Sequence, residues 1–502
     1  MNGKNRLREY REGILLGIVA LLWYGLFLGS KGLWGDELIT VQNTLMKFSE
    51  SVMNRFKAGH QMPLYYIFQW FWSRLAGRSE WALRFPSTVA AAASVTLCYY
   101  FTRAHFDRPT ARAAALCLLL NQMHLWAAQN ARTYAFLVLF MILCGESMLR
   151  MLMGSRSRKH LLLFWISGIL LVSMHPVCLL ILMSLFVALV WIRGIKGLRC
   201  DIIWWSAVFL PVALVALSLN AYLYYLNRNF LAGEGDIKPF KLLSRSLTRL
   251  VSVWYGEYRI FTGDWFKYLG LLVMAWALYH LWRRKNIIET EKKAGEELTL
   301  YLKYHLTVFF GIAFFLYLAG FKSSTFVGPQ RYMIPALASI PVIQALVWKS
   351  LASGIQRRNA AYAFLFVLFF VSLMGQLQPG VGLRTGVQKV MALLEEENPP
   401  PAVFCCSTGA PVSAFHYYHY KGPPLNPVLR AEKDASRIRK LIVEKVAPGE
   451  RFAVLIYKND ESVFRRHLRG ETALYRILRE YNFNKTDVWL IQRLDGMNRQ
   501  NP

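Results

Sequence analysis

The chain has 502 residues, of which 55% are hydrophobic and only 18% are charged. A soluble domain of this length carries more charge and fewer continuous apolar runs, so the composition excludes an ordinary soluble protein. The formal net charge is +29. This charge does not indicate nucleic-acid binding, because most Lys and Arg residues fall in short loops between apolar runs, where they set the orientation of a membrane protein.

The apolar runs predict an α-helical polytopic membrane protein with about eleven transmembrane helices, each near the ~20 residues that a span needs. Only helices or closed barrels satisfy the backbone in lipid, and the runs are too long and uniform for barrel strands. The predicted spans cover, approximately, residues 14–30, 84–102, 112–128, 134–152, 161–175, 176–192, 202–220, 266–282, 304–321, 333–350 and 360–377. The basic loops alternate along the chain, which places the amino terminus in the cytoplasm.

The first apolar run also has the features of a signal peptide, since basic residues precede it and the small residues Gly29 and Ser30 follow it. Cleavage there would leave the next polar motif at a free end. We therefore expect an uncleaved first span.

Two long loops are predicted on the outer face. Within the first, residues 31–83, the segment Glu37–Phe56 has the mixed helical spacing of an interfacial helix. Leu64–Leu75 is rich in aromatic residues and too short to span, so it is expected to lie along the interface. The second loop covers 221–265.

After Leu377 the sequence becomes mostly polar. We expect a transmembrane domain over 1–378 and a small periplasmic α/β domain over 379–502. Short strands are predicted at Ala402–Cys405, Phe452–Tyr457 and Asp487–Gln492, and helices at Asp434–Lys445 and Glu461–Tyr481.

Polar residues recur where the predicted spans reach the outer face. Asp36 and Glu37 follow the first span within Trp34-Gly35-Asp36-Glu37. Other polar residues at outer span ends are His60, Arg84, Gln129, Arg132, Tyr134, His175, Lys322, Arg331 and Tyr332. Taken singly, each is more often a helix cap, a loop charge or a snorkelling side chain. Their shared face, against the positive-inside trend, is what indicates a site.

Cations near the lipid boundary can hold a phosphate, and Arg does so well because its planar group offers paired donors. A nearby carboxylate can accept the proton of an attacking hydroxyl. A lipid-linked phosphosugar fits this arrangement: its tail lies among the spans, and the cations stabilise the phosphate as it leaves.

The motifs, taken in order, resemble the membrane-integral glycosyltransferases of the GT-C superfamily. The resemblance is to the bacterial family 39/83 group in particular, which is akin to the protein O-mannosyltransferases and the aminoarabinose transferase of lipid A. It covers about residues 10–340 and rests on Trp34–Glu37, His60–Tyr66, Glu80–Ser87, Gln129–Tyr134, His175 and Gln330–Pro335. It implies a GT-C fold, a polyprenyl-phosphate sugar donor, and inverting transfer at the outer face of the inner (cytoplasmic) membrane.

The resemblance also implies roles for single residues. Asp36 would be the catalytic base. The donor phosphate would be bound by Arg132 and Arg331, helped by His175 and Lys322. Substrate contacts would come from Glu37, His60, Arg84, Gln129, Tyr134 and Tyr332. Glu37 could instead orient the start of a helix.

Two positions depart from the family pattern. Many relatives carry Glu where this chain has Asn130, and many carry Pro-Pro where it has Met62-Pro63. The missing acid weakens the case for a bound divalent metal, so no cofactor is expected.

The acceptor could be lipid A, another glycolipid, a growing polysaccharide of the cell envelope or a protein. A transporter or flippase of lipid-linked saccharides is the alternative function. Carriers usually place functional charges near the bilayer midplane, often within repeated halves, whereas these charges sit at the rim and no internal repeat is found. A structural assembly subunit would need none of the outer-face residues.

Overall fold

The computed structural model describes residues 3–57, 62–231, 275, 279, 292–320, 330–351, 355–377, 402–405, 425–427, 442, 444–457, 475–483 and 486–494. The contacts divide the chain into two units. One comprises residues 1–28 and 47–378, and the other comprises residues 29–46 and 379–502. The segment 29–46, which the sequence assigns to the transmembrane domain, groups in the structure with carboxyl-terminal residues.

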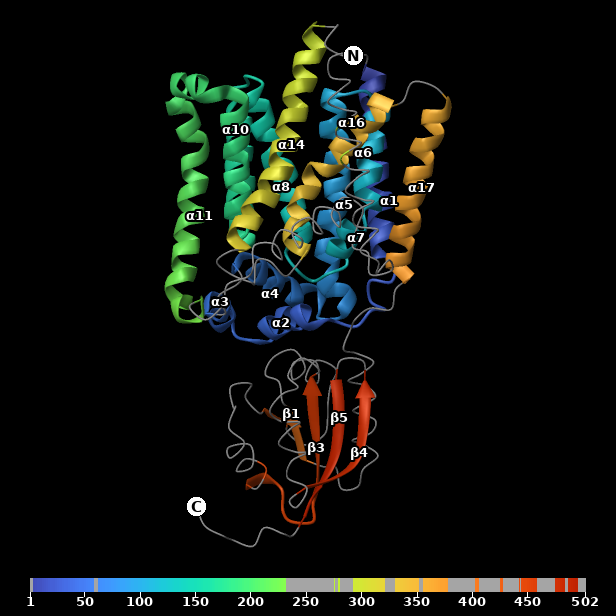
Figure 1. The fold of residues 1–502 in the computed structure, drawn as a ribbon, viewed down its shortest axis with the longest axis vertical. Coiled ribbons are helices and arrows are strands. Elements are labelled where there is room, and N and C mark those ends of the chain that lie inside the picture. Colours follow the sequence, from blue (N-terminus) through green and yellow to red (C-terminus); the bar gives the residue numbers. More distant parts are fainter. Residues whose placement is uncertain are drawn as a thin grey trace. The chain divides into compact units, whose positions relative to one another are not determined.

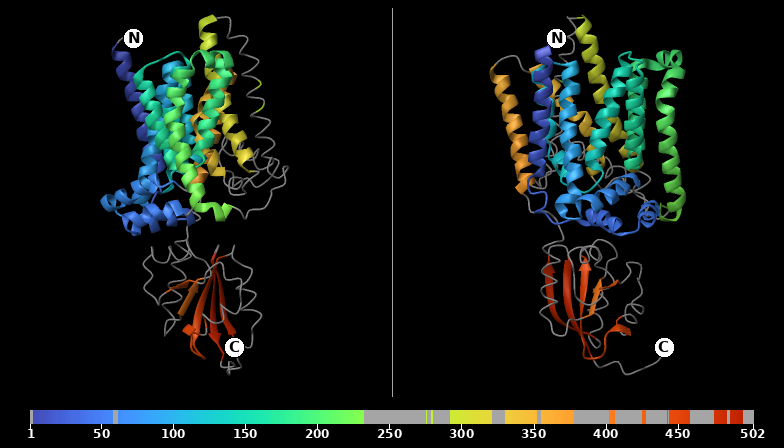
Figure 2. Two further views of the ribbon diagram at one scale, coloured as in Figure 1. Left: turned by 90° about the vertical axis from the view of Figure 1, so that its left-hand side faces the viewer. Right: turned by 180° about the vertical axis from the view of Figure 1, so that it is seen from behind.

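The first unit is a bundle of long helices that run roughly side by side, with two short helices, α3 and α4, lying across one end (Figure 1). Its helices are α1 (Gly3–Gly25), α3 (Phe48–Lys57), α4 (Leu64–Ala76), α5 (Glu80–His105), α6 (Arg108–Leu120), α7 (Gln122–Ala128), α8 (Tyr134–Leu152), α9 (Arg158–Met174), α10 (Cys178–Cys200), α11 (Ile202–Leu231), α14 (Lys292–Gly320), the 3-10 helix η1 (Gln330–Ala338), α16 (Ile340–Leu351) and α17 (Ile355–Leu377). Helix α17 lies beside α1, and α11 lies at the opposite side of the bundle (Figure 2).

Several of these helices can cross a membrane. Within the described residues, four helices are long and apolar enough, or five if η1 and α16, bent by 50°, form one span. The four are Tyr134–Leu152, Cys178–Cys200, Ile202–Tyr225 and Leu298–Ala319. The chain is therefore a multi-pass membrane protein. The total of eleven spans stays a prediction, and the predicted span 266–282 lies outside the described residues apart from residues 275 and 279.

Two predicted spans are broken in the structure. The prediction of one continuous helix over 112–128 is wrong, because α6 and α7 are separated at Asn121. The Asn121 side chain accepts hydrogen bonds from the amides of Met123, at 2.9 Å, and His124, at 3.2 Å, and so caps α7. The predicted span 333–350 is divided between η1 and α16. Pro335, which has no amide hydrogen to donate, lies inside η1.

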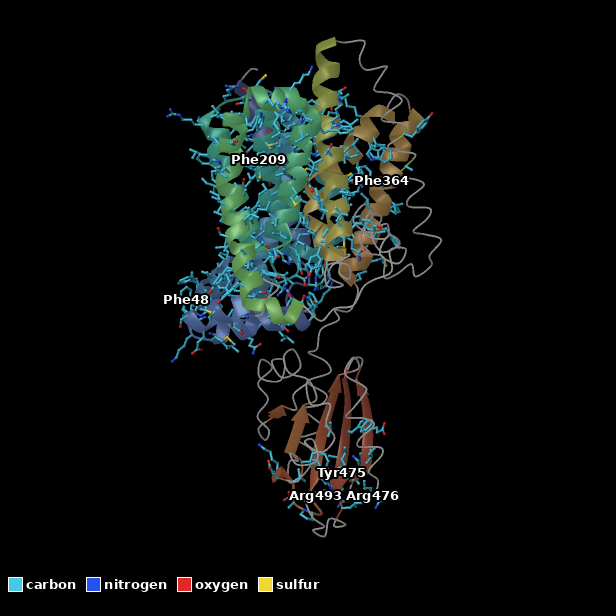
Figure 3. The ribbon with its side chains drawn as sticks, turned by 60° about the vertical axis from the view of Figure 1, so that its left-hand side comes forward. Phe48, Phe209, Phe364, Tyr475, Arg476 and Arg493 are labelled. Atoms are coloured by element: carbon cyan, nitrogen blue, oxygen red, sulfur yellow. The ribbon has the colours of Figure 1, made fainter. Side chains whose placement is uncertain are left out.

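The bundle is joined by close helix contacts and aromatic rings. A Cβ atom at Gly17 of α1 would lie 2.1 Å from Thr96 Oγ1 of α5, so these two helices approach closely at this position. Phe209 of α11 packs edge-on against Phe164 of α9, with ring centroids 5.5 Å apart (Figure 3). Phe48 of α3 (labelled in Figure 3) lies at the end covered by the short helices. The centroid of its ring is 5.2 Å from that of Trp70 of α4.

The second unit contains helix α2 (Gly35–Leu45) and a five-stranded sheet. Its strands are β1 (Ala402–Cys405), β2 (Leu425–Pro427), β3 (Arg451–Tyr457), β4 (Tyr475–Phe483) and β5 (Thr486–Arg493), in the order β2-β1-β3-β5-β4. Strand β1 is parallel to both β2 and β3, whereas β5 is antiparallel to β3 and β4.

Three of these strands lie where the sequence predicts strands. The predicted helix Glu461–Tyr481 is wrong from Tyr475 onward, because this stretch forms β4 and pairs with β5. Its apolar residues fit a helical period as well as a strand, and pairing with a neighbouring strand decides between them. Residues 461–474 and most of 434–445 lie outside the described residues.

Glu12, just before the apolar run of α1, joins three helices. Its carboxylate accepts a hydrogen bond from Tyr99 Oη of α5 at 2.8 Å and forms ion pairs with Arg108 and Arg112 of α6. Burial alone would raise the pKa of Glu12. Hydrogen bonds from Arg112, Tyr99 and Arg108 outweigh burial and leave the pKa below its ordinary value.

Replacing Glu12 with glutamine removes these ion pairs and keeps the side-chain shape. We expect Glu12→Gln to lower the free energy of unfolding in detergent at neutral pH by about 1 kcal/mol, the order found for ion pairs that are not deeply buried. The carboxyl pKa is lower in the folded than in the unfolded protein. The stabilisation is therefore present above the unfolded value, 4.5, and is lost as the pH falls through the folded value.

Thermal unfolding followed by tryptophan fluorescence across the acidic range tests this. The difference in unfolding temperature between the wild type and Glu12→Gln should become smaller below about pH 4.5. Glu50→Gln, on the exposed surface of α3, is the matched control. A gap that stays constant down to the acid limit would contradict the assignment.

Candidate functional site

Arg132 lies in the short loop between α7 and α8 and is 3% exposed. Its Nη1 donates a hydrogen bond to Tyr66 Oη of α4 at 2.6 Å, and its guanidinium carbon lies 5.9 Å from the centroid of the same ring. A buried guanidinium held by a phenol keeps its full charge, since Arg is not deprotonated in proteins. Arg132 therefore places a fixed positive charge inside this end of the bundle.

Hydroxyl groups of α5 hold the loop that carries Arg132. Ser87 Oγ donates to the Arg132 carbonyl at 3.2 Å, and Thr88 Oγ1 donates to the Ala128 carbonyl at 3.0 Å. Both hydroxyls are fully buried. The backbone on each side of the loop is thus fixed by one helix, which sets where the Arg132 side chain begins.

Tyr66 is one of two adjacent buried tyrosines in α4. The Tyr65 and Tyr66 rings meet edge-on, with centroids 5.6 Å apart. Gln69 Nε2 donates to Tyr65 Oη and to the Leu83 carbonyl, both at 2.8 Å. Burial raises the pKa of Tyr65 well above its usual range, although the Gln69 hydrogen bond and the Arg132 charge oppose this. The Tyr65 hydroxyl therefore stays protonated.

The other predicted residues of this loop point into the protein. Gln129 Nε2 donates to the carbonyls of Tyr24 and Leu26 and to Gln376 Oε1. Asn130 stands where many relatives carry Glu. Its side-chain amide donates to the Trp126 carbonyl near the end of α7. Tyr134 is 1% exposed, and its ring lies 5.2 Å from that of Trp126.

Arg84, near the start of α5, is 3% exposed. Its Nη1 donates to the Leu28 carbonyl at 2.8 Å, where the chain leaves α1. The sequence assigns this arginine to substrate, and the structure places one of its donors on the backbone. The substrate contact stays a prediction.

A second group of predicted residues forms around η1, which packs against α7, α8, α14 and α16. His175 ends α9, is 5% exposed, and its ring lies 5.2 Å from that of Tyr332. The Arg331 guanidinium carbon lies 5.8 Å from the Tyr332 ring centroid. The Val177 amide donates to His175 Nδ1, so a neutral imidazole carries its proton on Nε2.

Asp36 and Glu37 lie in the first turn of α2, in the second unit. Glu37 is fully buried, and its Oε2 accepts a hydrogen bond from the Trp34 amide at 3.2 Å, as the third residue of a capping box does. Asp36 is partly exposed. Glu37 thus fixes the start of the helix that carries Asp36.

Two predicted residues, His60 and Lys322, lie outside the described residues. Among the residues that the structure describes, no group of three His, Cys, Asp or Glu side chains is placed to hold a metal ion.

Sequence reasoning missed the supporting residues Tyr65, Tyr66 and Gln69. The two tyrosines stand inside the motif His60–Tyr66, so their place in that motif was the signal. Gln69 gave none, since a glutamine in an aromatic helix fits an interfacial surface equally well.

Comparison with known proteins gives one family match and several structures of similar fold. The family described as dolichyl-phosphate-mannose-protein mannosyltransferase matches residues 60–208. ArnT from Cupriavidus metallidurans in the apo state is similar with a TM-score of 0.61 at 14% identity, over 95% of this chain and 97% of that chain. The structure of that protein bound to undecaprenyl phosphate gives 0.58 at 13% identity, with the same coverage.

The Archaeoglobus fulgidus oligosaccharyltransferase AglB, in complex with an inhibitory peptide and a dolichol-phosphate, gives a TM-score of 0.51 at 12% identity, over 97% of this chain and 75% of that chain. No curated protein sequence matches the chain. The family match covers less than half of the chain, and the solved structures, at 12–14% identity, show that the chain shares their fold. Both findings agree with the resemblance noted in the sequence.

The contact between Arg132 and Tyr66 can be tested through stability. Tyr66→Phe removes the hydroxyl that accepts the bond from a buried charged donor, which costs about 1–3 kcal/mol. Tyr65→Phe is the matched control, because Gln69 Nε2 keeps the Leu83 carbonyl as an acceptor. We expect a clearly larger fall in the free energy of unfolding for Tyr66→Phe, measured by thermal unfolding in detergent. Equal losses would show that the Arg132 contact contributes little.

Proposed function

We propose that this protein transfers a sugar from a polyprenyl-phosphate carrier to an acceptor on the outer face of the cytoplasmic membrane. Two observations support the donor class: the shared fold with a protein that binds undecaprenyl phosphate, and the buried Arg132 guanidinium held by Tyr66. The second observation carries the proposal, because it supplies a fixed, buried cation in the loop between α7 and α8. The acceptor would be lipid A, another glycolipid, a polysaccharide or a protein.

In the proposed site the donor phosphate is held by Arg132 and Arg331, with His175 and Lys322 assisting. Arg132 is anchored through Tyr66, and Arg331 and His175 both lie near the Tyr332 ring. These contacts fix the charged groups before a phosphate arrives. A pre-set cation stabilises a developing phosphate charge without having to reorganise during the reaction.

The proposed reaction is a single displacement. The Asp36 carboxylate takes the proton of the acceptor hydroxyl, and the acceptor oxygen forms a bond to the anomeric carbon. The bond from that carbon to the phosphate oxygen breaks, and its electron pair leaves with the polyprenyl phosphate. Attack opposite the leaving group inverts the anomeric centre. Glu37 acts by holding the first turn of α2 rather than by taking a proton.

The base assignment is tested with Asp36→Asn. Asparagine keeps the size of the side chain but cannot accept the proton, and a general base contributes about 10²- to 10⁴-fold to the rate. We expect turnover to fall by this factor while the affinity for undecaprenyl phosphate stays unchanged. Turnover is measured as release of undecaprenyl phosphate from lipid-linked sugars by the purified protein in nanodiscs.

Asp107→Asn is the control, because Asp107 caps α6 and asparagine is an equally good cap. Undiminished transfer by Asp36→Asn would overturn the base assignment. If the wild type moves lipid-linked sugar across a vesicle membrane and releases no undecaprenyl phosphate, it is a carrier and the transfer reaction is wrong.

The phosphate assignment is tested with Arg132→Lys. Lysine keeps the charge but loses the planar fork, so paired hydrogen bonds to a phosphate are lost. We expect the dissociation constant for undecaprenyl phosphate to rise about tenfold or more, measured by isothermal titration in nanodiscs, in line with the ~1.5–3 kcal/mol of a charged hydrogen bond. Lys159→Arg, exposed on α9, is the control. An unchanged dissociation constant would place the phosphate elsewhere.

A further inference from the structure

The carbonyl groups at the end of α1 are bound by side chains from three other helices. Helix α1 ends at Gly25, and Phe27 then adopts a φ of 58°, which is disfavoured for residues other than glycine. The carbonyls of a last helical turn have no partner within the helix. Where such a turn packs inside a bundle, its carbonyls need donors from elsewhere in the protein.

Gln129 supplies two of these donors from the end of α7. Its Nε2 donates to the Tyr24 carbonyl at 3.0 Å and to the Leu26 carbonyl at 2.9 Å. The same amide lies 2.7 Å from Gln376 Oε1 of α17. The two N–H groups of Gln129 are therefore shared among three acceptors.

Gln376 continues the network along α1. Its Nε2 donates to the Trp23 carbonyl at 2.6 Å, and the residue is 2% exposed. Arg84 of α5 donates to the Leu28 carbonyl, five residues farther along the chain. Four carbonyls between Trp23 and Leu28 are thus held by Gln129, Gln376 and Arg84.

Three parts of the chain that matter for the proposed site are close in sequence to this network. Two are the connections to the second unit, and the third is the loop that carries Arg132. The chain passes from the first unit to the second between residues 28 and 29, and again between residues 378 and 379. The first crossing leads to Asp36, and the second follows directly after Gln376. Gln129 itself stands three residues before Arg132. The contacts of Gln129 and Gln376 therefore connect these three parts of the chain.

We propose that Gln129 and Gln376 are positioning residues that fix the last turn of α1 and the start of the chain that leads from it to Asp36. The inference rests on the proposed function for the role of Asp36. Neither glutamine needs to touch substrate. They act through backbone carbonyls, so they set where the segment 29–46 begins rather than what it binds.

The geometry predicts a specific kinetic effect. A displacement of about 1 Å in a reacting group can cost 10²-fold in rate, even when the altered residue is far from the chemistry. Loss of the glutamine contacts should shift the root of the Asp36 segment, while the Tyr66 contact still holds Arg132. The rate constant of transfer should therefore fall while donor binding is retained.

The test uses Gln129→Met and Gln376→Met in the full-length protein in nanodiscs. Methionine has nearly the length of glutamine but donates no hydrogen bond. We expect kcat to fall at least tenfold in each variant with a KM for the lipid-linked sugar within about twofold of the wild type. The double variant should be little worse than the more affected single variant, because both residues belong to one network.

Ser372→Ala is the matched control. Ser372 Oγ accepts a hydrogen bond from Trp23 Nε1 at 3.2 Å, so it also joins α17 to α1, one turn before Gln376, but through the Trp23 side chain rather than its carbonyl. We expect Ser372→Ala to leave kcat within about twofold of the wild type. A kcat loss in Ser372→Ala equal to that of the glutamine variants would overturn the proposal, because any contact between the two helices would then suffice.

Hydrogen–deuterium exchange of the peptide covering residues 29–46 provides a readout that does not depend on activity. Exchange should accelerate at least fivefold in both glutamine variants and stay at the wild-type rate in Ser372→Ala. Unchanged exchange in both glutamine variants would overturn the positioning role. If the wild type transfers no sugar, the proposed function fails, and the exchange result still decides whether the glutamines hold the segment.

Discussion

A backbone polar group that is buried inside a helical bundle must find its partner in the protein, and this constraint shapes how the bundle is joined. The end of α1 is the clearest case. Side chains from α5, α17 and the end of α7 donate to four carbonyls between Trp23 and Leu28. Without these donors the turn at Phe27 would expose unsatisfied groups, and the segments that depart from it would have no fixed origin.

The same constraint explains the interruptions in the bundle. At Asn121 the chain stops one helix and starts another inside an apolar stretch, and the asparagine side chain takes up the amides that the new helix leaves open. Ser87 and Thr88 do the corresponding work for carbonyls at the next loop. The polar residues in these spans therefore serve mainly the backbone, and the loops they hold carry the candidate site.

The sequence predicted the membrane-helical class and the position of most long helices, since a continuous apolar run has few other solutions. It did not predict the break at Asn121, because one asparagine barely changes the apolar pattern. It also assigned Tyr475–Tyr481 to a helix, because that stretch fits both a helical and a strand period and only the pairing with β5 decides between them. Long-range pairs are the hardest to foresee: Gln129 and Gln376 are 247 positions apart.

The candidate site, too, could be predicted only in part from the sequence. Arg132 could be selected from the sequence because it shares the outer face with other polar residues and stands in the family motif Gln129–Tyr134. Its contact with Tyr66 could not be predicted, because the sequence does not show where α4 lies against the loop. Gln129 and Arg84 were also selected, as substrate contacts. In the structure each of them donates to a backbone carbonyl, so their described contacts hold the backbone near the site.

The choice of acceptor at the exit of α1 has a consequence for how such proteins diverge. A carbonyl is present on every residue, so Leu26, whose side chain is 46% exposed, can be exchanged for many others without removing the group that Gln129 binds. Hydrogen bonds from a side chain to a backbone carbonyl therefore preserve a fold while allowing the residues of its helices to change. A fold shared over 95% of the chain at only 14% identity is the pattern that such hydrogen bonds permit.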